Sequence, residues 1–214
     1  MARASDSQNL DPSRIMLGVL DAVEQDRVQS QRHLASELGI ALGLANAYLK
    51  RCIGKGLVKV RQAPARRYAY YLTPQGFAEK SRLTVEYLSS SFGFFREAKV
   101  DCSDVLQAAK ARGVGTVLLL GQSDLAEIAA LCAIEQGVTI AGTVQPGAGG
   151  QQFVGRPVFD TCDAVTEPFD CVVVTDVGDA RRICDEAVTR FGVERVLVPK
   201  LLRLRMRTPA EQAS

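Results

Sequence analysis

The hydrophobic period of the sequence changes at about residue 116, and this change constrains the fold more than any other feature. Beyond it, the apolar residues stand in short continuous runs, and helix-period patterns fill the stretches between the runs. The runs are Thr116–Leu120, Val138–Val144, Cys171–Thr175 and Arg195–Val198, with helical stretches from Asp124 to about Gln136 and over Asp179–Phe191. Buried strands that alternate with helices predict a parallel sheet covered on both faces. We therefore expect a Rossmann-like α/β domain in this half of the chain.

The first half of the chain predicts a smaller α+β domain instead. Its periodic segments and turn signals give three helices followed by a two-stranded hairpin. The predicted elements are helices over Ser13–Glu24, Gln31–Leu38 and Ala41–Ile53, strands over Leu57–Arg61 and Tyr68–Leu72, and a long helix that opens at Thr73–Gly76. Ser30 stands where it can cap the second helix, and Gly39 where it can end it. This order of elements is a winged helix-turn-helix.

Charge is distributed unevenly between the two halves. Residues 1–99 hold 15 Lys and Arg against 9 Asp and Glu, whereas residues 100–214 hold 11 against 15. The stretch Leu38–Ala78 contains seven basic residues and no acidic one. A polyanion attracts such a tract, whereas it would repel acidic side chains. The predicted partner of the first half is double-stranded DNA.

The predicted helix over Ala41–Ile53 has an outer face that suits a recognition helix. Gly43, Asn46, Ala47 and Lys50 recur at helical spacing opposite the apolar face. Small residues permit close approach to base edges, and an Asn side chain can make two hydrogen bonds to adenine. The alternative is that Asn46 and Lys50 are only solvated. The predicted DNA contacts are Leu42, Gly43, Asn46, Ala47, Lys50, Arg51, Lys55, Arg61, Arg66 and Arg67.

Two segments of this half carry a family resemblance. SQRHLASELGIALGLANAYLKRCIGKGLVKV and YAYYLTPQGFAEKSRLTVEYL resemble the winged-helix regulators of the MarR-like group, particularly those associated with exopolysaccharide gene clusters. The resemblance covers about Pro12 to Ser90. It implies a sequence-specific transcriptional regulator, with polysaccharide genes as expected targets. Ala41 stands where the family usually has Ser or Thr, which removes an N-cap and a phosphate contact.

The turn after the first buried strand of the second half is the predicted ligand site. In a Rossmann-like sheet, ligands bind at the carboxyl ends of the strands, and the N–H groups at the helix start attract phosphate. The dinucleotide fingerprint G-x-G-x-x-G appears only as Gly121-x-Ser123-x-x-Ala126, and Gln145 stands where an acidic residue would bind a ribose. We expect a nucleotide, a nucleotide-sugar or another small phosphorylated ligand. NAD(H), or a domain kept only for dimerisation, are the alternatives.

Two further resemblances bear on this ligand. VLLLGQSDLAEIAALCAIEQGVTIAGTVQP and FVGRPVFD are similar to the nucleotide-binding domains of sugar O-acyltransferases, without the hexapeptide repeat that carries their chemistry. The layout of winged helix, FGFF segment and Rossmann-like domain resembles the NADH-sensing Rex-type repressors. These resemblances imply two alternative functions, a Rex-like redox repressor and an acyltransferase-like or reductase-like enzyme remnant. The predicted pocket comprises Gly121, Gln122, Ser123, Asp124, Leu125, Gln145, Thr175 and Asp176, with Arg156 in a loop as an anion contact or an ordinary surface residue.

Composition narrows the function classes. The single histidine, His33, lies in the predicted helix-turn-helix, so we expect no histidine base in the ligand pocket and no enzyme activity. Six scattered cysteines without a C-x-x-C pair predict a reducing compartment and no metal site. No apolar run approaches the ~20 residues of a membrane span, so we expect a cytoplasmic protein.

The predicted organisation has four parts: residues 1–75 for DNA binding, residues 76–100 as a linker and dimerisation helix, residues 101–207 for the ligand, and residues 208–214 as a tail. Aromatic residues at Phe92–Phe95 beside the long helix can contact a partner subunit or pack within the same chain, and the sequence leaves both open. We expect a homodimer.

Overall fold

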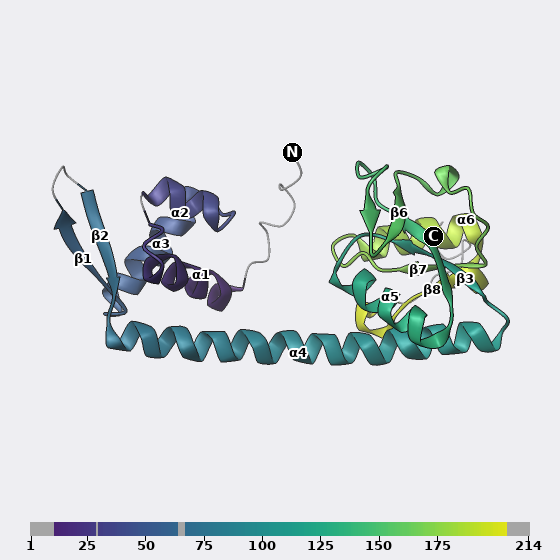
Figure 1. The fold of residues 1–214 in the computed structure, drawn as a ribbon, viewed down its shortest axis with the longest axis horizontal. Coiled ribbons are helices and arrows are strands. Elements are labelled where there is room, and N and C mark those ends of the chain that lie inside the picture. Colours follow the sequence, from purple (N-terminus) through teal and green to yellow (C-terminus); the bar gives the residue numbers. More distant parts are fainter. Residues whose placement is uncertain (1–10, 29, 64–66, 205–214) are drawn as a thin grey trace, which may run out of the picture. The chain divides into compact units, whose positions relative to one another are not determined.

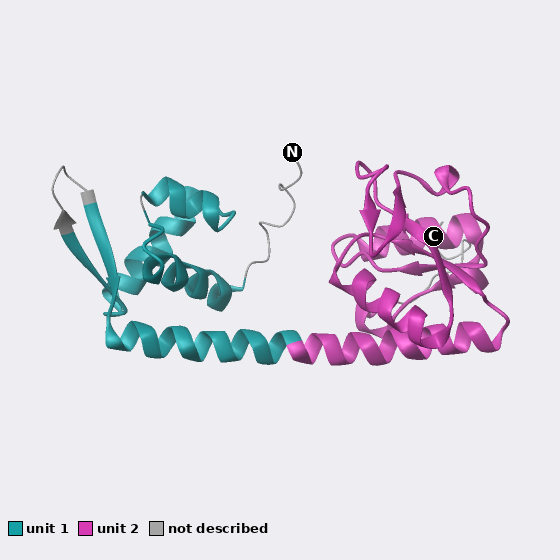
Figure 2. Cartoon of the chain, in the orientation of Figure 1, with its two compact units in different colours: residues 1–91 teal, residues 92–214 magenta. Residues whose placement is uncertain are grey.

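The computed structural model describes residues 11–28, 30–63 and 67–204, apart from the side chains of residues 62, 63 and 67 (Figure 1). The chain divides into two compact units, residues 1–91 and 92–214 (Figure 2). This boundary falls within one helix, so residues 76–91 belong to the first unit and residues 92–100 to the second. A separate segment of residues 76–100 stays a prediction, and the predicted tail of residues 208–214 lies outside the described residues.

The first unit contains three helices, a hairpin and the start of a long helix. The elements are α1 (Pro12–Glu24), α2 (Gln31–Glu37), α3 (Leu42–Gly54), β1 (Val58–Ala63), β2 (Arg67–Leu72) and α4 (Pro74–Ala111). The strands β1 and β2 are antiparallel, with Val58 opposite Leu72 and Lys59 opposite Tyr71. The bounds of the three short helices and the two strands lie within two residues of the predicted ones. This arrangement confirms the predicted helix-turn-helix with a wing.

Each helix of the first unit contributes a leucine to one small core. Leu20, Leu34 and Leu49 are almost completely buried there, from α1, α2 and α3 respectively. Local signals set the helix ends: the Ser30 hydroxyl accepts a hydrogen bond from the backbone N–H of His33, and Gly39 has a φ of +63°. The positive φ favours glycine, which explains the turn between α2 and α3.

The second unit is built on a six-stranded sheet in the order β5-β6-β4-β3-β7-β8. The strands are β3 (Thr116–Leu120), β4 (Thr139–Val144), β5 (Gln152–Phe153), β6 (Arg156–Phe159), β7 (Cys171–Val174) and β8 (Val196–Leu197), accompanied by helices α5 (Asp124–Gln136) and α6 (Ala180–Phe191) and short 3-10 helices η3 (Cys162–Ala164), η4 (Val193–Arg195) and η5 (Lys200–Leu202). All neighbouring strands are parallel except the β5–β6 hairpin.

Helices cover both faces of this sheet, as predicted. Leu119 and Val173 pack on one face with α5 and the last turns of α4, whereas Leu118 and Val172 pack on the other with α6. The second unit is therefore an α/β domain with a mostly parallel sheet, which confirms the predicted α/β class and is compatible with a Rossmann-like domain. The β5–β6 hairpin was not predicted, because its strands are too short to give a periodic signal. Placing Arg156 in a loop was wrong, since this residue begins β6.

The helix α4 contributes to the core of each unit and also carries exposed apolar side chains. Leu83 packs in the core of the first unit, and Cys102 and Leu106 pack in the core of the second. Val85 and Leu88 in the first unit are exposed. Within the described residues, no helix is long and apolar enough to cross a membrane.

Candidate DNA interface and candidate ligand pocket

The helix α3 has a buried inner face and a solvent-exposed outer face. Ala45, Leu49 and Cys52 are buried in the core of the first unit, and burial raises the pKa of the Cys52 thiol from 9.0 to about 11. Gly43, Ala47, Lys50 and Arg51 are exposed, together with Leu42 and the C-cap residue Lys55. The predicted outer face therefore exists, with small residues near the helix start and cations near its end.

The start of α3 has no side-chain cap. The backbone N–H groups of Leu44 and Ala45 donate to the Ala41 carbonyl, and Ala41 itself offers no side-chain acceptor. The first turn also lacks an acidic residue. A Cβ added at Gly43 would meet no atom within 4 Å. This helix start therefore presents its positive end without any carboxylate to offset it.

Asn46 differs from its neighbours on the predicted outer face. Its side chain is half-buried, and its Oδ1 atom is buried without a hydrogen-bond partner in the described part of the chain. The Oδ1 atom must become exposed before it can accept a hydrogen bond from adenine. Its contact with adenine stays a prediction.

The wing places a cation beside an exposed aromatic ring. Lys59 and Arg61 are exposed on β1, and Lys59 lies opposite Tyr71, whose side chain is also exposed. The predicted contacts omitted Lys59 and Tyr71, although their period-2 alternation places both on the face of Arg61. Arg66 lies outside the described residues, and of Arg67 only its place at the start of β2 is described.

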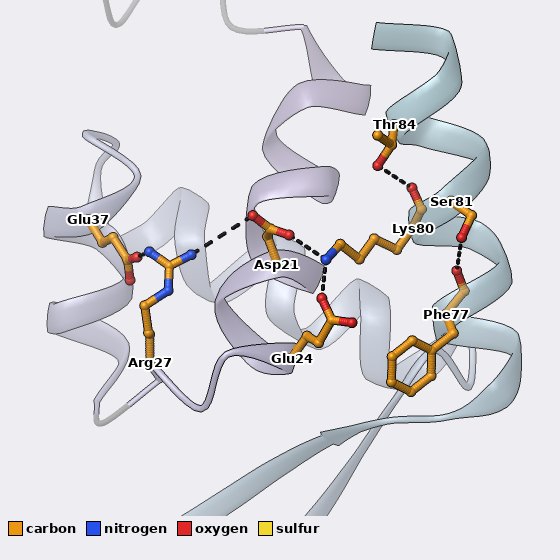
Figure 3. A network of polar contacts seen from close by, with 8 residues as sticks. All are labelled: Asp21, Glu24, Arg27, Glu37, Phe77, Lys80, Ser81 and Thr84. Carbon is orange, nitrogen blue, oxygen red and sulfur yellow. Dashed lines mark hydrogen bonds and ion pairs between the residues drawn. The ribbon is translucent and has the colours of Figure 1, made fainter. Parts of the chain in front are cut away.

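The acidic side chains that form ion pairs in the first unit do so with cations outside α3 and β1. Asp21 and Glu24 of α1 bind Lys80 of α4, and Arg27 bridges Glu37 and Asp21 (Figure 3). On α4, Arg82 pairs with both Glu79 and Glu86. Among residues that the structure describes, none forms an ion pair with the cations of α3 and β1, namely Lys50, Arg51, Lys55, Lys59 and Arg61. These five cations can therefore bind an external polyanion without breaking an internal pair.

In the second unit, the carboxyl ends of β3, β4 and β7 bring most of the predicted pocket residues together. The backbone N–H of Gln122 donates to the Gln145 side chain at 2.9 Å. The Ser123 hydroxyl donates to the Thr175 carbonyl at 2.6 Å and accepts from the N–H of Ala126. The Thr175 hydroxyl is itself fully buried against the carbonyls of Leu120 and Gly121.

These contacts use the groups that a phosphate would need. Two N–H groups at the start of α5 already donate to Gln145 and Ser123, and the first turn carries Asp124 and Glu127, which would repel an anion. In the loop after β4, backbone donors are likewise occupied, because the Asp160 carboxylate accepts hydrogen bonds from the N–H groups of Gly147 and Gly149. Several backbone N–H groups at this edge of the sheet therefore already donate hydrogen bonds to side chains of the same chain.

Three predicted pocket residues occupy special positions. Leu125 is completely buried in the core, so its side chain does not face a ligand. Arg156 begins β6 three residues before Phe159, which pairs with the last residue of β4, so it lies about 10 Å along the strand from this edge. Gly121 has a φ of +102°, and a Cβ there would lie 2.5 Å from the Asp176 Cβ. Glycine is therefore required at this position by the close approach of Asp176, two residues after the end of β7.

Comparison with known proteins identifies the first unit. A family model described as winged helix-turn-helix DNA-binding matches residues 12–59. The chain therefore carries a winged helix-turn-helix DNA-binding domain at its N-terminal end. No curated protein matches the sequence.

Two solved structures are similar in part. The PcaV transcriptional regulator from Streptomyces coelicolor, solved with its natural ligand, is 22% identical over 42% of this chain, with a TM-score of 0.36. The match spans only 62% of the PcaV chain. Human N-acetylserotonin methyltransferase, solved with SAM, is 12% identical over 83% of this chain and 71% of its own, with a TM-score of 0.31. Both TM-scores are low, so neither likeness bears on the function.

Proposed function

We propose that this protein is a transcriptional regulator that binds specific sites on duplex DNA, with α3 in the major groove and the β1–β2 wing on the sugar-phosphate backbone. The observation that carries the proposal is the set of five exposed cations on α3, at its C-cap and on β1, none of which forms an ion pair within the described part of the chain. Small side chains let a recognition helix approach base edges, and cations beside them neutralise phosphates.

The second unit has no histidine, which agrees with a role in binding rather than in acid–base catalysis. His33 lies exposed on α2 in the first unit, so the α/β unit has no histidine to act as a base. We propose a regulator rather than an enzyme.

We also propose that the regulator acts as a homodimer through α4. Val85 and Leu88 of the first unit are 64% and 44% exposed, and Phe92 and Phe95 of the second unit are 58% and 40% exposed. Their spacing of three, four and three residues is that of a helix-pairing seam. A two-fold dimer would bind two symmetric half-sites. Sedimentation of the full chain at micromolar concentration should give a dimer, and Leu88→Glu should give a monomer.

A small phosphorylated ligand at the carboxyl edge of the second unit remains the proposed signal. It would have to displace the Gln145 side chain from the Gln122 N–H, because this contact occupies a donor at the start of α5. Calorimetry of the full chain with NADH, nucleoside triphosphates and nucleotide-sugars tests this proposal. Binding of none of them would leave the domain as a dimerisation scaffold.

The DNA-binding proposal is tested by measuring affinity for the promoter region of the protein's own gene as a function of salt. Each phosphate contact releases counterions and contributes about −0.9 to the slope of log K against log salt. Lys50→Ala and Lys59→Ala should each remove one phosphate contact and so make the slope less steep by about 0.9. Arg182→Ala is the matched control, because Arg182 is an exposed cation of the second unit that pairs with Asp179 and Glu186. Affinity without salt dependence would contradict the proposal.

Gly43→Ala tests the placement of α3 separately. The added methyl group meets no atom of the protein, so the fold should tolerate it. In a helix that lies close to base edges, the same methyl group should weaken binding to the specific site and leave binding to random duplexes nearly unchanged. Equal affinities of Gly43→Ala and the unchanged protein for the specific site would remove α3 from the groove.

A further inference from the structure

The start of α3 exposes two leucines that the core of the first unit does not use. Leu42 and Leu44 are 41% and 39% exposed, and neither belongs to the hydrophobic cluster formed by the inner face of the helix. They stand on either side of Gly43, at which an added Cβ would meet only open space. One turn later the exposed side chain is Ala47. Leu42, Gly43, Leu44 and Ala47 thus form an exposed apolar strip, in which the two leucines lie on opposite flanks of Gly43.

The polar groups near this strip are poorly suited to contact base edges. Asn46 keeps its Oδ1 atom buried, and the cations Lys50 and Arg51 come only in the later turns. Cations that contact phosphates fix the position of a protein on DNA but carry no sequence information. Selectivity from the first turns must therefore come from apolar contact, from Asn46 once its Oδ1 atom is exposed, or from both.

The major groove presents one apolar group, the C5-methyl group of thymine. Contact between this methyl group and an aliphatic side chain distinguishes thymine from cytosine without any hydrogen bond. An exposed leucine next to a glycine fits this requirement, because the glycine allows the helix backbone to approach and the leucine reaches the edge of the base.

We infer that Leu42 and Leu44 determine specificity by packing on thymine methyl groups, so that the preferred DNA carries thymines at fixed positions in each half-site. The inference rests on the proposed function and adds the chemical group that is recognised. Leu44 was not among the contacts predicted from the sequence. Its position two residues after Leu42 places the two side chains on opposite flanks of the Gly43 strip.

The experiment begins with selection of duplexes from a random pool by the full chain. Each thymine of the enriched sequence is then replaced singly by uracil, which removes the methyl group and keeps every hydrogen-bonding atom. We expect about a fourfold loss of affinity at each contacted thymine, the equivalent of one buried methyl group, and none at the others. In Leu44→Ala, the ratio of the affinities for the thymine and uracil duplexes should fall to one at the thymine that Leu44 contacts. In Leu42→Ala, the same ratio should fall to one at a different thymine.

Lys50→Ala is the matched control, because it should weaken binding overall and leave each thymine-to-uracil ratio near four. Both leucine variants should melt close to the unchanged protein, because neither side chain belongs to the hydrophobic core of the first unit. Enrichment of a sequence in which no uracil replacement matters would overturn this inference and leave the proposed function standing. Thymine-to-uracil ratios that survive in both leucine variants would also overturn it. Enrichment of no sequence would instead overturn the proposed function.

Discussion

The two units begin a helix in opposite ways, at α3 in the first and at α5 in the second. The start of α3 has no side-chain cap and no carboxylate in its first turn, and exposed cations follow it. The start of α5 is capped by Ser123, donates a further N–H to Gln145 and carries Asp124 and Glu127. A helix start can attract an external anion only where the chain leaves its donors free, so α3 is better suited than α5 to bind a phosphate.

From the sequence alone, the two helix starts look alike, and the start of α5 even looks like the better phosphate site. Each follows a turn that contains glycine, and the second carries part of a dinucleotide fingerprint whereas the first has lost the usual Ser or Thr. The fingerprint describes where a phosphate could sit. It does not describe whether Gln145, more than twenty residues away, already occupies the site.

Alanine should have opposite effects at Gly121 in the second unit and at Gly43 in the first, and the change at Gly121 should be the greatest of those proposed. Gly121→Ala should destabilise the second unit by roughly 3 kcal/mol or more, because it combines a positive φ with a clash against the backbone of Asp176. Gly43→Ala should stabilise the first unit by up to about 1 kcal/mol, since alanine favours a helix and meets no neighbour. Urea denaturation with a separate probe for each unit measures both changes. A well-tolerated alanine at residue 121 would show that the edge of the sheet is open.

The close contact at Gly121 also decides how the ligand proposal can be tested. A larger residue at this position would disturb the second unit before it could block a phosphate. Loss of ligand response in such a variant therefore carries no information about phosphate. Gln145→Ala is the better change, because it frees the Gln122 N–H and should leave the fold intact, so that a phosphorylated ligand binds more tightly.

The next effect concerns the cap of α5. Ser123→Ala should cost about 1–2 kcal/mol of the stability of the second unit, because it removes the N-cap bond to Ala126 and the bond to the Thr175 carbonyl. Ser30→Ala, which removes only the cap of α2, is the matched control and should cost about 1 kcal/mol in the first unit. Equal losses in urea denaturation would mean that the bond between Ser123 and Thr175 contributes nothing.

The opposite change is available at α3. Ala41→Ser supplies the acceptor that the helix start lacks and should raise the stability of the first unit by about 0.5–1 kcal/mol. If the uncapped N–H groups bind a DNA phosphate, the new hydroxyl will compete for them or join the contact, so affinity should change together with stability. A stability gain with unchanged affinity would show that DNA does not use this helix start.

Local signals in the sequence predicted most of the fold, and long-range contacts account for what they missed. The cap at Ser30, the turn at Gly39 and the buried strand Thr116–Leu120 depend on neighbours in the sequence, and each prediction is confirmed. The β5–β6 hairpin depends on pairing with β4, and its strands are too short to show a pattern. The buried oxygen of Asn46 depends on packing within the folded unit, which a helical period cannot reveal.

The smallest expected effect follows from a carboxylate that serves the second unit internally. Asp170 accepts hydrogen bonds from the backbone N–H groups of Thr116 and Gly115, and these bonds hold its pKa below the ordinary value of 3.8. A depressed pKa in the folded state means that the charged form stabilises the unit above pH 3.8, and that this contribution is lost as the pH falls through the folded value. Asp170→Asn should therefore be slightly less stable than the unchanged protein at pH 7, with the difference vanishing in acid. The side chain is fully exposed, so solvent screens the interaction and keeps the effect small.

Lys80→Met in the first unit is the control for this pH dependence. Lys80 donates hydrogen bonds to Asp21 and Glu24, and these bonds raise its pKa above 10.5. Its contribution therefore persists through neutral pH and is lost only as the pH rises through the folded value. The titration of Lys80 itself should therefore add no pH dependence between pH 3 and pH 7. Stability curves of the two variants across this range, with one probe in each unit, separate the two cases. A stability difference between Asp170→Asn and the unchanged protein that stays constant down to pH 2 would contradict this prediction. It would mean that the hydrogen bonds from the N–H groups of Gly115 and Thr116 stabilise the second unit equally well whether the Asp170 carboxyl group is charged or neutral.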